Sequence, residues 1–99
     1  MSDIKKERLL KAREETYWFY VKELAEAYNT LQEKKKEIYS IAKDLRTDET
    51  QSDKHRQMRV AAIKSNVDFI NILRQRIDIL TDTISIVKET IKEINNEKK

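Results

Sequence analysis

Residues 63–94 read IKSNVDFINILRQRIDILTDTISIVKETIKEI, and this stretch decides the fold. Isoleucine recurs at every seventh residue, and in four of the five repeats an apolar residue follows three positions later. The two series are Ile63, Ile70, Ile77, Ile84 and Ile91, and then Asn66, Leu73, Leu80, Val87 and Ile94. Isoleucine at heptad position a with leucine or valine at d is typical of a coiled-coil seam. The stretch therefore predicts a long helix that packs along one face.

The N-terminal half carries a matching apolar stripe. The series that recurs every seven residues is Leu10, Tyr17, Leu24, Leu31, Ile38 and Leu45. Further apolar residues stand three or four positions after members of that series: Tyr20, Val21, Ala27, Tyr28, Ile41 and Ala42. Because residues three and four apart share one face of a helix, this half is also predicted to form one long helix.

The segment between the two halves is the only predicted break. The 99-residue chain contains no Gly, no Pro and no Cys, and 39% of its residues are charged. Residues 46–54 contain no apolar side chain but several that can cap a helix start. We expect one all-α domain over residues 1–99, with helix 1 at about 3–46, a polar turn at about 47–51 and helix 2 at about 51–96. The fold is predicted to be an antiparallel two-helix hairpin of the coiled-coil type, and the alternative is one continuous helix through residues 46–54.

A second apolar stripe on helix 2 predicts self-association. Its members are Ile72, Ile79 and Ile86. On a helical wheel they lie about 100° from the d positions, outside the seam that a two-helix hairpin needs. Helix 1 is too narrow to cover them, so we predict a homodimer of hairpins that forms a four-helix bundle.

Four aromatic residues stand together at Tyr17, Trp18, Phe19 and Tyr20. If the turn centres near residue 49, residues 17–21 lie beside residues 77–81, where the outward isoleucines also gather. Exposed contiguous apolar surface marks an interface, and Trp and Tyr are common anchors. We therefore assign the four aromatics and the three outward isoleucines to a protein interface. Trp18 and Phe19 then pack in a dimer core, bind a different protein or remain exposed.

The net charge of +3 is unevenly distributed. Residues 34–64 hold nine Lys or Arg and five Asp or Glu, whereas the rest of the chain holds twelve and thirteen. The basic residues proposed to meet a partner are Lys34, Lys35, Lys36, Lys54, Arg56, Arg59 and Lys64. A basic patch is the electrostatic footprint of nucleic-acid binding, but it also suits an acidic protein or a solvated helical surface.

One polar residue interrupts the apolar ladder. Asn66 occupies a d position, and in the predicted register Gln32 and Lys35 face it. A single Asn in a coiled-coil core can fix register and oligomeric state at some cost in stability. We interpret Asn66 as a residue that sets the register rather than as a catalytic group.

The residues of catalytic and metal sites are largely missing. His55 is the only histidine, and neither a Cys nor a Glu-x-x-His pair is present to bind zinc or di-iron. A Gly-rich phosphate loop is excluded by the absence of Gly. We predict no enzymatic activity, no cofactor, no metal and no small-molecule substrate.

The predicted function is a non-enzymatic helical protein–protein interaction module that acts as a homo-oligomer: an adaptor, an inhibitor or a small structural component. The alternative is a small nucleic-acid-binding dimer that uses the basic residues near the turn. The charged start of the chain and the lack of a long apolar run predict no membrane and a cytoplasmic location, or host cytoplasm if the chain is viral. Abundant Ile and Lys are typical of AT-rich genes, and hence favour a phage or plasmid origin.

Overall fold

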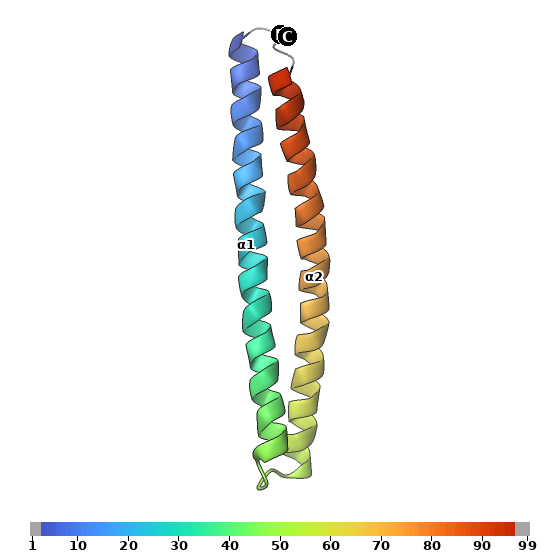
Figure 1. Ribbon diagram of the computed structural model, residues 1–99. Helices are drawn as coiled ribbons and strands as arrows, with labels where there is room; N and C mark the ends of the chain where they lie inside the picture. Colours follow the sequence, from blue (N-terminus) through green and yellow to red (C-terminus); the bar gives the residue numbers. More distant parts are fainter. Residues whose placement is uncertain (1–2, 97–99) are drawn as a thin grey trace. The chain divides into compact units, whose positions relative to one another are not determined.

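The chain folds into two antiparallel helices joined by a short turn. The computed structural model describes residues 3–96, and no strand occurs among them. Helix α1 spans Asp3–Thr47 and helix α2 spans Asp53–Asn96. The two helices lie side by side and run in opposite directions (Figure 1). The predicted all-α hairpin is therefore confirmed, and the alternative of one continuous helix is wrong.

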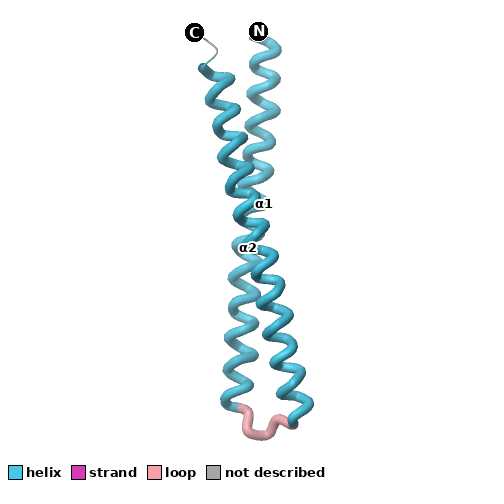
Figure 2. The backbone as a smooth tube through the Cα atoms, turned by 90° about the vertical axis from the view of Figure 1, so that its right-hand side faces the viewer, coloured by secondary structure: helices cyan, strands magenta, loops and turns pink. Residues whose placement is uncertain are grey.

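Residues 48–52 form the turn, drawn in pink in Figure 2. The last carbonyl groups of a helix have no partner within the helix and need one from outside. The Gln51 side chain supplies it for α1, because its Nε2 donates a hydrogen bond of 3.0 Å to the Leu45 carbonyl. The Asp48 N–H continues the helical pattern by donating to the Asp44 carbonyl at 2.9 Å. The turn thus ends α1 through a side chain rather than through a glycine.

Ser52 caps the start of α2. Its Oγ accepts a hydrogen bond of 3.2 Å from the His55 N–H, and its carbonyl accepts one of 2.9 Å from the Arg56 N–H. This is the arrangement of an N-cap serine. The first helical residue is consequently Asp53, two residues after the predicted start at 51.

The predicted seam is the core. Every a and d position of α2 from Ile63 to Ile94 is buried or half-buried, and so is the seven-residue series of α1 from Leu10 to Leu45. The buried apolar side chains are Ala27, Leu31, Ile70, Leu73, Ile77, Leu80, Val87 and Ile94. Full burial of one such large aliphatic side chain contributes about 1.5–3 kcal/mol. One charged residue is also buried among the described residues: Lys6 is only 7% exposed.

The helix pair divides into two compact halves. The open half consists of residues 3–26 of α1 and 77–96 of α2, and the turn half consists of residues 27–76. Each half is an antiparallel helix pair with its own part of the seam, and each is described by itself below.

In the turn half, one contact between the helices joins a residue about five positions away from the one that the predicted register pairs. The Lys34 Nζ lies 5.4 Å from the centre of the Phe69 ring, whereas the predicted register places residue 64 there. Part of the difference arises because the turn occupies residues 48–52 and so centres later than residue 49.

Two predicted contacts depend on that register. The predicted pairing of residues 17–21 with residues 77–81 lies in the open half and stays a prediction. The Gln32 side chain is exposed, and Lys35 lines a groove together with Val67 and Ile70, so the predicted pairing of both with Asn66 stays a prediction. The heptad seam itself is unaffected, because both registers bury the same a and d positions.

Candidate interaction surfaces

Among the described residues, twelve large apolar side chains are exposed outside the seam. They are Ile4, Trp18, Phe19, Tyr28 and Tyr39 in α1, and Met58, Val60, Val67, Phe69, Ile72, Ile79 and Ile86 in α2. Tyr28 was predicted to belong to the α1 stripe, but it lies at the edge of the stripe and is 47% exposed. These side chains, not the seam, are the candidates for contact with other molecules.

The exposed side chains fall on two sides of the helix pair. Heptad positions c and g flank the d positions, and positions b and e lie beyond a. Because the helices are antiparallel, c and g of both helices share one side, which we call the c/g flank, and b and e share the other, the b/e flank. Contacts in the turn half agree: Lys34 at a d position lies over Phe69 at g, and Lys35 at e lines a groove with Val67 at e.

The aromatic stretch in the open half is divided between these flanks. Tyr17 and Tyr20 occupy seam positions and are half-buried, whereas Trp18 is 65% and Phe19 58% exposed. Trp18 stands at b and Phe19 at c, about 100° apart on α1. The predicted single aromatic cluster is therefore two surfaces, with Trp18 on the b/e flank and Phe19 on the c/g flank.

Each exposed ring packs against a half-buried tyrosine. The Tyr17 and Trp18 rings meet edge to face with centroids 5.2 Å apart, and the Phe19 and Tyr20 rings do so at 5.4 Å. Edge-to-face pairs are a favourable arrangement of aromatic quadrupoles. The seam tyrosines consequently hold both exposed rings in defined positions, which suits a preformed contact surface.

The outward isoleucines are exposed, each on the c/g flank of its own half. In the open half Ile79 and Ile86 are each 65% exposed and share that flank with Phe19. In the turn half Ile72 is 62% exposed, together with Met58 and Phe69. Sequence reasoning missed Met58, although its spacing of fourteen residues from Ile72 places it at the same heptad position.

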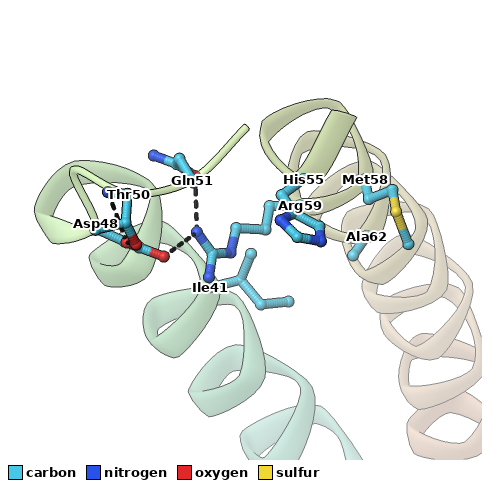
Figure 3. Close-up of a pocket in the computed structure, with 8 residues that line it drawn as sticks. All are labelled: Ile41, Asp48, Thr50, Gln51, His55, Met58, Arg59 and Ala62. Atoms are coloured by element: carbon cyan, nitrogen blue, oxygen red, sulfur yellow. Dashed lines mark hydrogen bonds and ion pairs between the residues drawn. The ribbon is translucent and has the colours of Figure 1, made fainter. Parts of the chain in front are cut away.

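The turn carries a polar cluster that the sequence did not reveal (Figure 3). The Arg59 Nη1 donates a hydrogen bond of 2.7 Å to the Gln51 Oε1 and lies 3.1 Å from the Asp48 Oδ2. Asp48 also accepts hydrogen bonds from the Thr50 hydroxyl at 2.6 Å and from the Thr50 N–H at 3.0 Å. Arg59 from α2 thus fixes the turn, which is a structural use of a residue predicted to contact a partner.

These contacts favour the charged form of the Asp48 carboxyl. Hydrogen bonds from the Thr50 hydroxyl and then from its N–H, followed by those from Arg59, hold the pKa of Asp48 below its usual value. Desolvation opposes this shift without outweighing it. Thr50 and Arg59 therefore bind the carboxylate of Asp48, a residue of the same chain, rather than that of a partner.

Lys34 is the second predicted contact residue that is engaged within the chain. Its Nζ lies 3.3 Å from the Glu37 Oε2 and rests over the Phe69 ring, so the side chain is half-buried. Of the remaining predicted basic residues, Lys35 is half-buried in a groove, and the following are exposed: Lys36, Lys54, Arg56 and Lys64. Two of the seven basic residues are therefore engaged within the chain, and a partner contact by the other five stays a prediction.

Asn66 lies in the seam as its position requires, but it is only half-buried. The adjacent d residues Leu73 and Leu80 are each 7% exposed. A polar side chain at partial exposure can keep contact with water, so Asn66 interrupts the ladder at its less buried end.

Over the described residues, no three His, Cys, Asp or Glu side chains gather where they could hold a metal ion. Within the same range, neither helix contains an apolar stretch long enough to cross a membrane. No protein-family model, curated protein or solved structure matches this chain.

Proposed function

We propose that this chain is a non-enzymatic protein–protein interaction module that self-associates through the c/g flank of its open half. As such it serves as an adaptor, an inhibitor or a small structural component. The observation that carries the proposal is the exposure of Phe19, Ile79 and Ile86 on one flank of a helix pair whose own seam is already filled.

The surface area of the chain supports this proposal. The accessible surface is 7994 Å², whereas a folded monomer of 11.9 kDa exposes about 5900 Å². The difference is about 2000 Å² for each chain, which lies in the range that obligate homodimers bury. Among the described residues, no side chain is less than 2% exposed. A second copy would supply the burial that one helix pair lacks.

The chemistry of the flank supports a second copy as the first partner. Phe19, Ile79 and Ile86 are each more than half exposed and carry no charge. Full burial of one such side chain contributes up to about 1.5–3 kcal/mol, so three of them on each of two copies contribute on the same scale as the cost of association. The predicted interface residue Trp18 stands on the b/e flank and is left outside this contact.

The nucleic-acid alternative has less support. Arg59 and Lys34, two of the residues on which it depends, are engaged with Asp48 and Glu37 inside the chain. Phosphate binding depends on the number of available cations, so each internal ion pair weakens that alternative.

Sedimentation equilibrium at micromolar concentration tests the proposal. We expect the wild type to sediment as a dimer and Ile79→Lys/Ile86→Lys to sediment as a monomer while circular dichroism still reports helix. The matched control is Ser85→Lys/Asn95→Lys, which adds the same charge at exposed positions outside the c/g flank and should remain a dimer. A monomeric wild type, or equal loss of the dimer in the control, would overturn the proposal.

A further inference from the structure

The b/e flank of the turn half has four basic side chains and one acidic one, Asp53, which is the first residue of α2 and lies next to the turn. Along α1 the b and e positions are Tyr28, Gln32, Lys35, Tyr39, Ala42 and Arg46, and along α2 after Asp53 they are Gln57, Val60, Lys64, Val67, Asn71 and Arg74. In contrast, the c and g positions of α1 in this half include Glu33, Glu37 and Asp44. The two flanks of the turn half are therefore distinct in charge, although the net charge of the chain is small.

A groove runs between the two helices on this flank. Its volume is about 270 Å³, and its lining includes Lys35, Ile38, Tyr39, Val67, Ile70 and Arg74. Ile70 is 6% exposed and belongs to the seam, so the floor is aliphatic. Lys35 and Arg74 place one cation from each helix at the same groove. An apolar floor between two cations is complementary to an apolar side chain flanked by carboxylates.

The exposed apolar residues on this flank repeat with a helical period. Val60 is 54% and Val67 41% exposed, and they stand seven residues apart on α2. On α1, Tyr39 is 75% exposed and Tyr28 47%. Anchors spaced by seven residues match a partner helix that lies along the groove.

We propose that the b/e flank of the turn half binds an acidic amphipathic helix of another protein. The partner helix inserts apolar side chains between Tyr39 and Val67 and pairs its carboxylates with Lys35, Lys64 and Arg74. This site lies apart from the self-association surface of the open half, and it gives the interaction module a second, chemically different binding surface.

A protein helix fits this flank better than a nucleic acid does. Phosphate groups would pair with the cations but would leave the exposed Val60 and Val67 in contact with water or with charge. Nucleic-acid binding without sequence preference relies on aromatic stacking and a continuous basic groove. Tyr39 offers one ring for stacking, but the exposed Val60 and Val67 interrupt the cations along α2, as in a site that accepts leucine or isoleucine from a helix.

Fluorescence anisotropy with a synthetic helix tests the proposal. The probe is a fluorescein-labelled peptide of about 21 residues, or three heptads, with Leu at every a and d position and Glu or Gln elsewhere. Three further probes keep one feature each: the same peptide with Lys in place of Glu, a polyglutamate of equal length, and a labelled oligonucleotide in single-stranded and duplex form. We expect saturable binding of the acidic amphipathic peptide alone.

Matched charge reversals locate the site. Lys35→Glu/Arg74→Glu should weaken binding of the acidic peptide by about tenfold or more, because both changes replace attraction by repulsion at the groove. Lys36→Glu/Lys43→Glu makes the same change in net charge at exposed positions on α1 outside the groove, and should change binding by less than about twofold. Tyr39→Ala removes an exposed side chain that the seam does not need, and should weaken binding severalfold while the helix content is unchanged.

The proposal is overturned if the acidic peptide does not bind, if polyglutamate or an oligonucleotide binds at least as tightly, or if both double variants lose affinity equally. Sedimentation of the same samples tests self-association independently of peptide binding. The groove variants should retain the dimer, whereas failure of self-association appears as a monomer whether or not the peptide binds.

Discussion

The two helices contribute unequally to the same seam. Six apolar side chains of α2 are buried, whereas only Ala27 and Leu31 are buried in α1. The reason lies in the d positions. In α2 they are Leu73, Leu80, Val87 and Ile94 after the polar Asn66, whereas in α1 they are Lys6, Arg13, Tyr20, Ala27, Lys34 and Ile41. Lys6 is itself only 7% exposed, whereas the long side chains of Arg13, Tyr20 and Lys34 leave their ends at the surface.

This difference shows what each helix does. Helix α2 supplies an aliphatic ridge that any complementary helix could bury. Helix α1 covers that ridge with side chains that also reach outward, such as Lys34 to Glu37 and Tyr17 to Trp18. The apolar surface that remains on the c/g flank of the open half belongs mainly to α2, at Ile79 and Ile86. The apolar surface of α2 that α1 leaves uncovered is therefore the surface that a second copy could contact.

The largest expected effect on stability comes from truncating one seam leucine to alanine in each helix. Leu80→Ala removes a side chain that is 7% exposed, so we expect the free energy of unfolding to fall by about 2–5 kcal/mol. Leu24→Ala removes a half-buried side chain in the same half and should lower it by roughly half as much. Denaturant unfolding at one fixed protein concentration measures both. Equal losses would contradict the unequal contribution of the helices.

A smaller effect is expected at the point where α2 begins. Ser52→Ala removes the hydroxyl that accepts the His55 N–H, and loss of such a cap lowers the free energy of unfolding by about 1 kcal/mol. The control is Ser40→Ala on the exposed surface of α1, where Ala is the better helix former. Thermal unfolding should therefore shift downward for the first variant and not for the second. If the two variants behave alike, Ser52 does not cap α2.

The smallest effect is a pH dependence at the end of α1. Because the pKa of Asp48 is lower in the folded chain, its contribution is fully present above the unfolded value and is lost as the pH falls below about 3.8 through the folded value. Asp48→Asn should therefore reduce the free energy of unfolding at neutral pH, and its difference from the wild type should vanish on acidification.

A second variant isolates the cause of that pH dependence. Thr50→Val removes the hydroxyl donor that lowers the Asp48 pKa most, so it should shrink the acid-sensitive part of the stability while leaving the Arg59 ion pair. Unfolding curves recorded at several pH values between neutral and acidic measure the change. If the wild type and Asp48→Asn have the same free energy of unfolding at every pH, the turn cluster contributes nothing to stability.

Much of the fold and part of the site could be predicted from the residues alone. The heptads fixed both helices and the seam, and the exposure of Trp18, Phe19, Ile79 and Ile86 follows from their positions on a helical wheel. The roles of Arg59 and Lys34 could not be predicted, because their partners Asp48 and Phe69 are brought close by folding. The basic groove also depends on folding, since Lys35 and Arg74 come from different helices.

By itself, the sequence determined two helices, a break within residues 46–54 and the face that each helix buries, because these depend on local periodicity and on the absence of Gly and Pro. Only the tertiary structure decided the register, which in the turn half places Lys34 over Phe69 rather than beside residue 64. The physical reason is that a heptad pattern repeats. Sliding one helix along the other still buries the same a and d positions, so periodicity cannot distinguish one register from the next. In the turn half, the observed register is the one in which Arg59 reaches Gln51 and Lys34 lies over Phe69.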